Sequence, residues 1–93
     1  MAIQSFRCAE TESLYHGRRT VRWANIERAA IRKLTQLAVS SRLEDLRIPP
    51  GNRLELLRAD RQGQYSIRIN DQWRVCFVWT NEGAHHVEIV DYH

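Results

Sequence analysis

The chain has 93 residues, of which 43% are hydrophobic and 27% are charged, as expected for a single globular domain over residues 1–93. It contains no apolar run near the ~20 residues of a membrane helix and no apolar signal segment at its start, so we expect a cytoplasmic protein without membrane contact. The formal net charge is +3, and Lys33 is the single lysine among the 14 basic residues. Arginine binds phosphate through a planar fork of donors, so this bias favours a nucleic-acid partner, although a high-GC genome produces the same excess.

The first part of the chain predicts a short strand and a short helix. Residues 2–7 are predicted to form a short strand with Ile3 and Phe6 facing inward. Thr11 is a plausible N-cap for a helix that ends near His16, and Gly17 follows as a stop residue.

A longer helix is predicted from about Trp23 or Asn25 to about Val39. Its apolar residues recur with a period of 3.6, and its charged residues lie mostly off that stripe. One more helical turn is predicted at residues 43–46, and the Pro-Pro-Gly sequence at residues 49–51 ends it.

The second half of the chain predicts strands. Apolar and polar residues alternate in four segments separated by turn residues, at positions 53–57, 64–69, 73–79 and 85–92. Helices that precede a series of strands indicate an α+β fold, in which the N-terminal helices pack on one face of an antiparallel β-sheet.

The hairpin at residues 64–79 predicts its own register. A three-residue loop at 70–72 places Ile67 opposite Val75 and leaves Arg68 opposite Arg74 on the other face. We expect the helices to cover the apolar face and the arginine face to stay open. Two opposed guanidinium groups repel each other unless an anion lies between them, so the pair predicts phosphate binding. Replacing either arginine should therefore leave stability unchanged or slightly raised.

The sequence ends with three residues that carry acid–base chemistry. Asp91, Tyr92 and His93 supply a carboxylate, a phenol and an imidazole, which together can act as base, charge stabiliser and acid. The alternative is a strand end that trails into solvent. We expect the last strand to place this group over the arginine face.

Other polar residues are weaker candidates. Glu55 is either a second acid–base group or part of a surface ion pair, and Arg58 and Arg61 flank a turn, where they either bind phosphate or are simply solvated. Cys8 and Cys76 lack the spacing of a metal site and read as buried free thiols. No zinc motif or Gly-rich phosphate loop is present, so we expect neither a metal nor a cofactor.

Three motifs together resemble the HigB-type toxins of the RelE/ParE superfamily: PPGNRLE at residues 49–55, SIRINDQWRVCF at 66–77 and VEIVDYH at 87–93. The resemblance covers nearly the whole chain. It implies a RelE-like toxin that enters the ribosomal A site and cuts the mRNA there by metal-independent acid–base cleavage. It also implies a helix-turn-helix, HigA-like antitoxin as partner, through which alone the toxin would reach operator DNA.

The resemblance also implies roles for individual residues. Family members use the Asp-Tyr-His triplet, here Asp91 to His93, and basic hairpin residues that match Arg68 and Arg74. Some members have a histidine where this chain has Glu55, and a carboxylate has a lower reference pKa than an imidazole. Two other functions stay open: a ParE-like, non-catalytic inhibitor of DNA gyrase, and a non-catalytic RNA-binding module.

Overall fold

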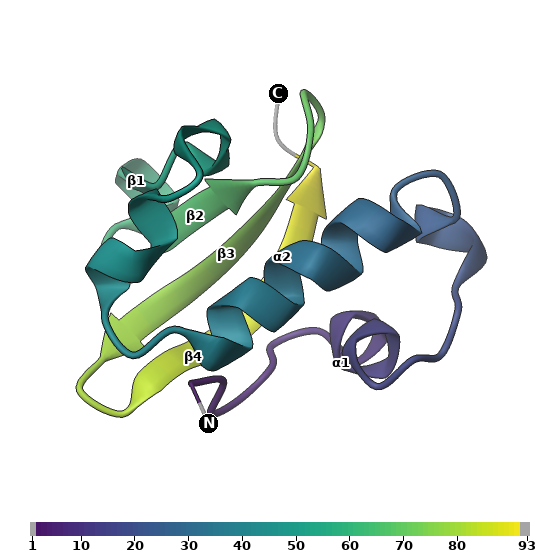
Figure 1. Ribbon diagram of the computed structural model, residues 1–93, viewed down its shortest axis with the longest axis horizontal. Coiled ribbons are helices and arrows are strands. Elements are labelled where there is room, and N and C mark those ends of the chain that lie inside the picture. Colours follow the sequence, from purple (N-terminus) through teal and green to yellow (C-terminus); the bar gives the residue numbers. More distant parts are fainter. Residues whose placement is uncertain (1, 92–93) are drawn as a thin grey trace.

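The computed structural model describes residues 2–91, which pack around one hydrophobic core (Figure 1). In chain order its elements, with η for 3₁₀ helices, are α1 (Ala9–Tyr15), η1 (Val21–Trp23), α2 (Glu27–Val39), η2 (Leu43–Arg47), η3 (Pro50–Asn52), β1 (Glu55–Leu56), η4 (Ala59–Arg61), β2 (Tyr65–Arg68), β3 (Trp73–Thr80) and β4 (Gly83–Asp91). Within these residues, no helix has the length and apolarity needed to cross a membrane.

The four strands form an antiparallel sheet in the order β1-β2-β3-β4. The predicted hairpin register is confirmed, because Ile67 pairs with Val75 and Arg68 with Arg74. The side-chain oxygen of Asn70 closes the loop by accepting hydrogen bonds from the backbone N–H groups of Gln72 and Trp73, at 2.9 and 2.8 Å. The α+β class and the antiparallel sheet are therefore confirmed.

Helix α2 lies across one face of the sheet (Figure 1). Its predicted apolar stripe is confirmed: Ala30, Leu34, Leu37 and Ala38 are buried and belong to the core that includes the apolar hairpin residues. The helix begins later than Trp23 because residues 21–23 form the separate turn η1. The face of the sheet turned away from α2 is called the outer face below.

The N-terminal segment differs from the prediction in two ways. Residues 2–7 form no regular strand, since only Ile3 and Phe6 make isolated parallel bridges to β4. Helix α1 begins at Ala9, so Thr11 lies inside the helix and is not its N-cap. The buried Thr11 hydroxyl instead accepts a hydrogen bond from the backbone N–H of Ile89 at 3.1 Å, so it serves the edge of β4.

The start of β4 requires a glycine. Gly83 has a φ of +126°, and a Cβ at this position would lie 2.0 Å from the carbonyl oxygen of Ala2. The same carbonyl accepts a hydrogen bond of 2.5 Å from the backbone N–H of Ala84. The N-terminal segment therefore crosses β4 at a point where no side chain fits.

The predicted strand at residues 53–57 is reduced to Glu55–Leu56. Arg53 and Ala59 adopt left-handed backbone conformations, with φ of 47° and 59°, which end the extended stretch on both sides. One further hydrogen bond, from Leu57 N–H to the carbonyl of Gln64 at 2.8 Å, holds the following segment against β2. The last predicted strand is confirmed as β4, which starts two residues earlier, and Tyr92 and His93 lie outside the described residues.

Candidate active site on the outer face of the sheet

A row of polar residues crosses the outer face of all four strands. The Cα pairing joins Glu55 to Ser66, Ser66 to Cys76, and Cys76 to Glu88. Since directly paired residues of an antiparallel sheet share a face, these four side chains lie side by side. In the neighbouring row Arg68 pairs with Arg74 and Arg74 with Val90.

Arg74 corrects the prediction of an open face. It is only 7% exposed, and its guanidinium donates from Nε to the Ser66 hydroxyl at 2.7 Å and from Nη2 to the Arg53 carbonyl oxygen at 2.6 Å. The segment after β1 covers this part of the sheet, with Leu57 only 6% exposed. These internal hydrogen bonds hold Arg74 as part of the protein structure, so the prediction that its removal leaves stability unchanged no longer follows.

Arg68 lies in a different environment although it faces Arg74. It forms an ion pair with Asp71 in the hairpin loop, and its side chain is 32% exposed. The carboxylate of Asp71 is fully exposed. A pair of this kind exchanges readily with solvent anions, so Arg68 is the more available of the two opposed arginines.

Arg61 connects η4 to β4. Its Nη1 donates to Glu88 Oε1 at 2.7 Å and to Gln64 Oε1 at 3.2 Å. The hydrogen bond with Glu88 is the main cause that raises the pKa of Arg61 above its ordinary value. One nitrogen of the predicted phosphate ligand Arg61 is thus already occupied by a carboxylate.

A groove runs along the segment that covers the outer face. One hollow of about 260 Å³ lies between η4 and the end of β4 and is lined by Leu57, Arg58, Asp60, Arg61, Val90 and Asp91. A second hollow of about 480 Å³ is lined by residues 55–59 and shares Leu57 and Arg58 with the first. Of the predicted site residues, Arg58 therefore lines both hollows, Arg61 and Asp91 line only the first, and Glu55 lines only the second.

Arg58 and Asp91 differ in their contacts. The carbonyl oxygen of Arg58 accepts a hydrogen bond from the backbone N–H of Arg61 at 3.2 Å, whereas its exposed guanidinium makes no hydrogen bond or ion pair within residues 2–91 and is free to bind an anion. Asp91 accepts a hydrogen bond from Gln72 Nε2 at 3.1 Å, which links the end of β4 to the hairpin loop. The chain continues from Asp91 into the predicted catalytic residues Tyr92 and His93.

The thiol under the groove is not a nucleophile. Cys76 is fully buried, and burial raises its pKa to about 11, so the thiol keeps its proton at neutral pH. Cys8 is half-buried, and both cysteines are free, as predicted. The described residues include no group of three His, Cys, Asp or Glu side chains that could hold a metal ion.

Sequence reasoning missed several groove residues. Leu57 and Asp60 belong to a segment that the pattern assigned to a strand and a turn, and nothing local indicates that it folds over the outer face. Gln72 was expected only as a loop residue, although it contacts Asp91. The signal available in the sequence for these residues was the charged pair Asp60 and Arg61, which follows Glu55 by five and six positions.

The sequence is similar to a known protein family and to two curated proteins. Residues 4–93 match a family model described as the RelE-like toxin of the type II toxin–antitoxin system HigB. Toxin HigB-1 of Vibrio cholerae is 47% identical over 58 residues, which are 62% of this chain and 61% of that protein. An uncharacterised protein of Haemophilus influenzae is 40% identical over 58 residues, or 62% of this chain and 57% of that protein. The matched stretch thus spans about three fifths of the length of these curated relatives.

Two solved structures share the fold. The YoeB–YefM complex from Staphylococcus aureus superposes with a TM-score of 0.62 at 16% identity, covering 100% of this chain and 99% of that one. YafQ from Escherichia coli superposes with a TM-score of 0.61 at 13% identity, covering 96% and 90%. At these identities the likeness establishes the fold.

Proposed function

Because the chain belongs to the RelE-like toxins of type II toxin–antitoxin systems of the HigB family, we propose that it cleaves mRNA on the ribosome by metal-independent acid–base catalysis. The observation that supports this proposal best is the groove on the outer face. Its two hollows share Leu57 and Arg58, and each contains one predicted acidic residue, Asp91 in the first and Glu55 in the second. Cleavage of RNA requires a base, a cation and an acid in one place, and the groove contains the first two.

The reaction assigns a role to each candidate. A carboxylate, Glu55 or Asp91, takes the proton from a ribose 2′-hydroxyl, whose oxygen then attacks the adjacent phosphorus. Negative charge develops on the phosphate oxygens, where Arg58 lies in the groove and Arg68 lies nearby on the hairpin. The bond from phosphorus to the 5′-oxygen breaks as His93 donates a proton to that oxygen.

Tyr92 and His93 are included because of the sequence that follows β4. They directly follow Asp91, which lines the first hollow, in the sequence. Tyr92 donates a hydrogen bond to the phosphate or stacks on a base in this proposal. Arg61, held by Glu88, and Arg74, held by Ser66, shape the groove and add positive potential without direct contact to the substrate.

The need for a ribosome follows from the size of the groove. A shallow, open hollow of this kind cannot by itself hold an RNA strand in the geometry for in-line attack. We therefore propose that the ribosomal A site orients the mRNA. The partner that restrains the toxin is proposed to be a helix-turn-helix antitoxin of the HigA type.

Purified ribosomes programmed with a defined mRNA, followed by primer extension, provide the test. The wild-type protein should cut the mRNA in the A site and leave naked RNA intact. His93→Ala should reduce the cleavage rate by roughly 10²–10⁴-fold, as expected for loss of a general acid. His16→Ala is the matched control, since it removes an exposed imidazole at the end of α1, away from the groove.

Three results would contradict the proposal in different ways. Cleavage by His93→Ala at the wild-type rate would move the acid role to another residue. Inhibition of gyrase supercoiling by a wild-type protein that leaves mRNA intact would favour the ParE-like function. Retention of RNA without cleavage would indicate a binding module.

A further inference from the structure

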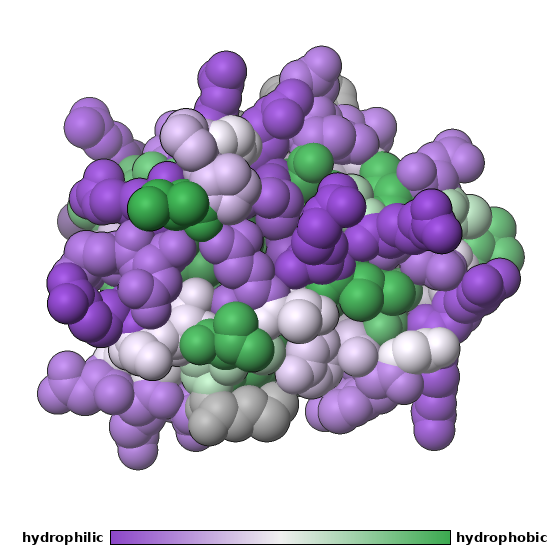
Figure 2. All heavy atoms as spheres, in the orientation of Figure 1, coloured by the Kyte–Doolittle hydropathy of each residue, from purple (hydrophilic) through white to green (hydrophobic). Residues whose placement is uncertain are grey.

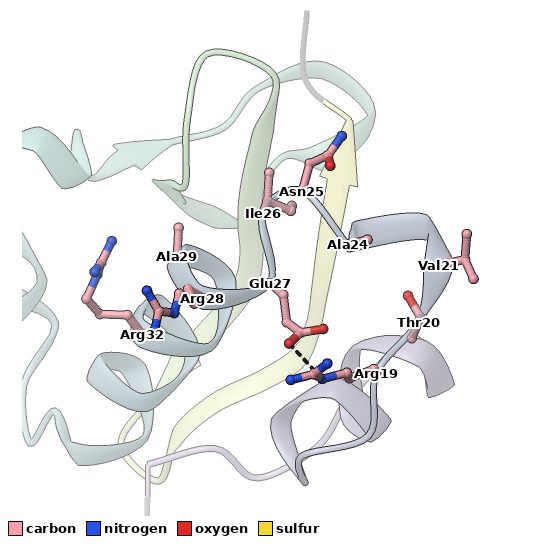
Figure 3. A pocket seen from close by; sticks show the side chains of 10 residues that line it. All are labelled: Arg19, Thr20, Val21, Ala24, Asn25, Ile26, Glu27, Arg28, Ala29 and Arg32. Carbon is pink, nitrogen blue, oxygen red and sulfur yellow. Dashed lines mark ion pairs between the residues drawn. The ribbon is translucent and has the colours of Figure 1, made fainter.

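A second cleft lies on the other side of the molecule, where η1 meets the start of α2 (Figure 3). Its volume is about 740 Å³, and it is separated from the groove on the outer face by the sheet and the core. None of the residues that form the candidate active site lines it. It is therefore a distinct surface with no role in the proposed reaction.

The cleft is basic. Figure 3 shows Arg28 and Arg32 side by side on α2, one helical turn apart, with Arg19 on the facing segment. The side chains of Arg28 and Arg32 are exposed, and their guanidinium groups make no hydrogen bond or ion pair within the described residues. Only Arg19 is neutralised, by an ion pair with Glu27 at 3.2 Å. Two guanidinium groups are thus free to bind carboxylates.

The position of Arg28 on α2 is unfavourable for its charge. Arg28 is the second residue of α2, where the positive end of the helix dipole disfavours a cation. Strongly hydrophilic side chains gather over the N-terminal half of α2 in Figure 2, directly beside hydrophobic surface. Exposed apolar surface rimmed by polar residues is typical of an interaction site.

The apolar part of the cleft favours a protein partner over RNA. Val21 is 95% exposed at its outer rim, and Ala24 and Ala29 also line the cleft. Single-stranded RNA is commonly bound by stacking of bases on exposed aromatic rings. The only aromatic residue of this segment, Trp23, is 1% exposed and offers no ring face. An aliphatic side chain of a partner, by contrast, would bury Val21.

We propose that this cleft binds an acidic peptide segment with an aliphatic anchor, supplied by a protein partner. Two carboxylates of the segment pair with Arg28 and Arg32, and the anchor packs against Val21. Because the cleft shares no lining residue with the groove, the segment binds without touching Glu55 or Arg58. The proposal does not depend on the proposed reaction.

The test uses the full chain labelled with ¹⁵N and a synthetic peptide in which Glu residues and Leu anchors recur at helical spacing. Addition of this peptide should shift the amide resonances of residues 19–32, and the same peptide with Gln in place of Glu should bind at least about tenfold more weakly. Arg32→Glu should weaken binding of the Glu peptide by about tenfold or more and flatten its salt dependence. Arg47→Glu is the matched control, because Arg47 is exposed on η2, outside the cleft, and should leave the affinity unchanged.

Four results would overturn the proposal. The first is the absence of any shift at residues 19–32 with peptide at about 1 mM. The second is equal binding of the Gln peptide, and the third is equal weakening by Arg32→Glu and Arg47→Glu. The fourth is displacement of the peptide by a single-stranded RNA oligonucleotide that shifts the same amides, which would make the cleft a nucleic-acid contact.

Discussion

Replacing Arg74 with alanine should destabilise the fold strongly. The substitution removes two hydrogen bonds from a charged donor, to the Ser66 hydroxyl and to the Arg53 carbonyl oxygen. Bonds of this kind contribute ~1.5–3 kcal/mol each, and their sum is an upper bound because they share one side chain. We therefore expect a loss of about 3 kcal/mol in the free energy of unfolding.

The competing effect is smaller. Removing Arg74 also relieves its repulsion with Arg68, and cross-strand pairs contribute only ~0.2–1 kcal/mol. The net loss should lower the melting temperature by roughly 8–24 °C for a domain of this size.

Thermal and urea unfolding, followed by circular dichroism, measure this change directly. Arg68→Ala is the control, since it removes only a half-exposed ion pair with Asp71 and should cost less than ~1 kcal/mol. Arg74→Lys keeps the charge but cannot bond both acceptors, so it should fall between the other two. If Arg74→Ala melts within about 2 °C of the wild type, then Arg74 is not a structural residue and the account of the outer face is wrong.

Three further predictions concern packing and charge. Gly83→Ala should lower the free energy of unfolding by roughly 4 kcal/mol or more, and with it the melting temperature, because the new Cβ would clash with the Ala2 carbonyl oxygen. In the native protein at pH 8, iodoacetamide should label Cys8 but leave Cys76 unmodified until denaturant is added, because burial raises the pKa of Cys76 to about 11. Mass spectrometry counts the labels. Arg28→Glu should raise the free energy of unfolding by ~0.3–1 kcal/mol in urea titrations, because an acidic residue favours the first turn of α2; an unchanged or lower value would contradict the dipole argument.

Local patterns were sufficient for the parts of the fold that repeat regularly. The 3.6-residue stripe of α2 and the alternation in the hairpin each fix which side chains face the core, so Leu34 and Ile67 could be placed from the sequence. Register followed for the same reason, because a shift by one residue would turn Ile67 and Val75 to the wrong face.

Long-range contacts could not be obtained in this way. Nothing near Thr11 indicates that its hydroxyl bonds the backbone of Ile89, and so the cap rule placed it wrongly. Arg74 is buried among neighbours distant in the sequence, since its guanidinium bonds the carbonyl oxygen of Arg53, 21 positions earlier. Alternation revealed that Arg74 faces away from the core, but not that a second layer covers it.

The candidate site was predictable in composition and not in shape. Glu55, Arg58 and Asp91 were singled out by residue type and family motif, whereas the two adjoining hollows that they line could not be foreseen. The basic cleft at α2 was not anticipated, although Arg28 and Arg32 are one turn apart in the sequence. Their significance depends on the exposed Val21 of η1, a neighbour that only the folded chain provides.

The closure of β4 by the N-terminal segment determines when, during synthesis, the groove on the outer face can form. The backbone N–H of His86 bonds the hydroxyl of Ser5, 81 positions earlier, and Ile89 bonds Thr11 across 78 positions. At ~5–20 residues per second, the first partner waits for the last on the order of 4–16 s. One wall of the groove, formed by Val90 and Asp91, does not exist during that interval. The groove is therefore completed only after the last strand has been synthesised.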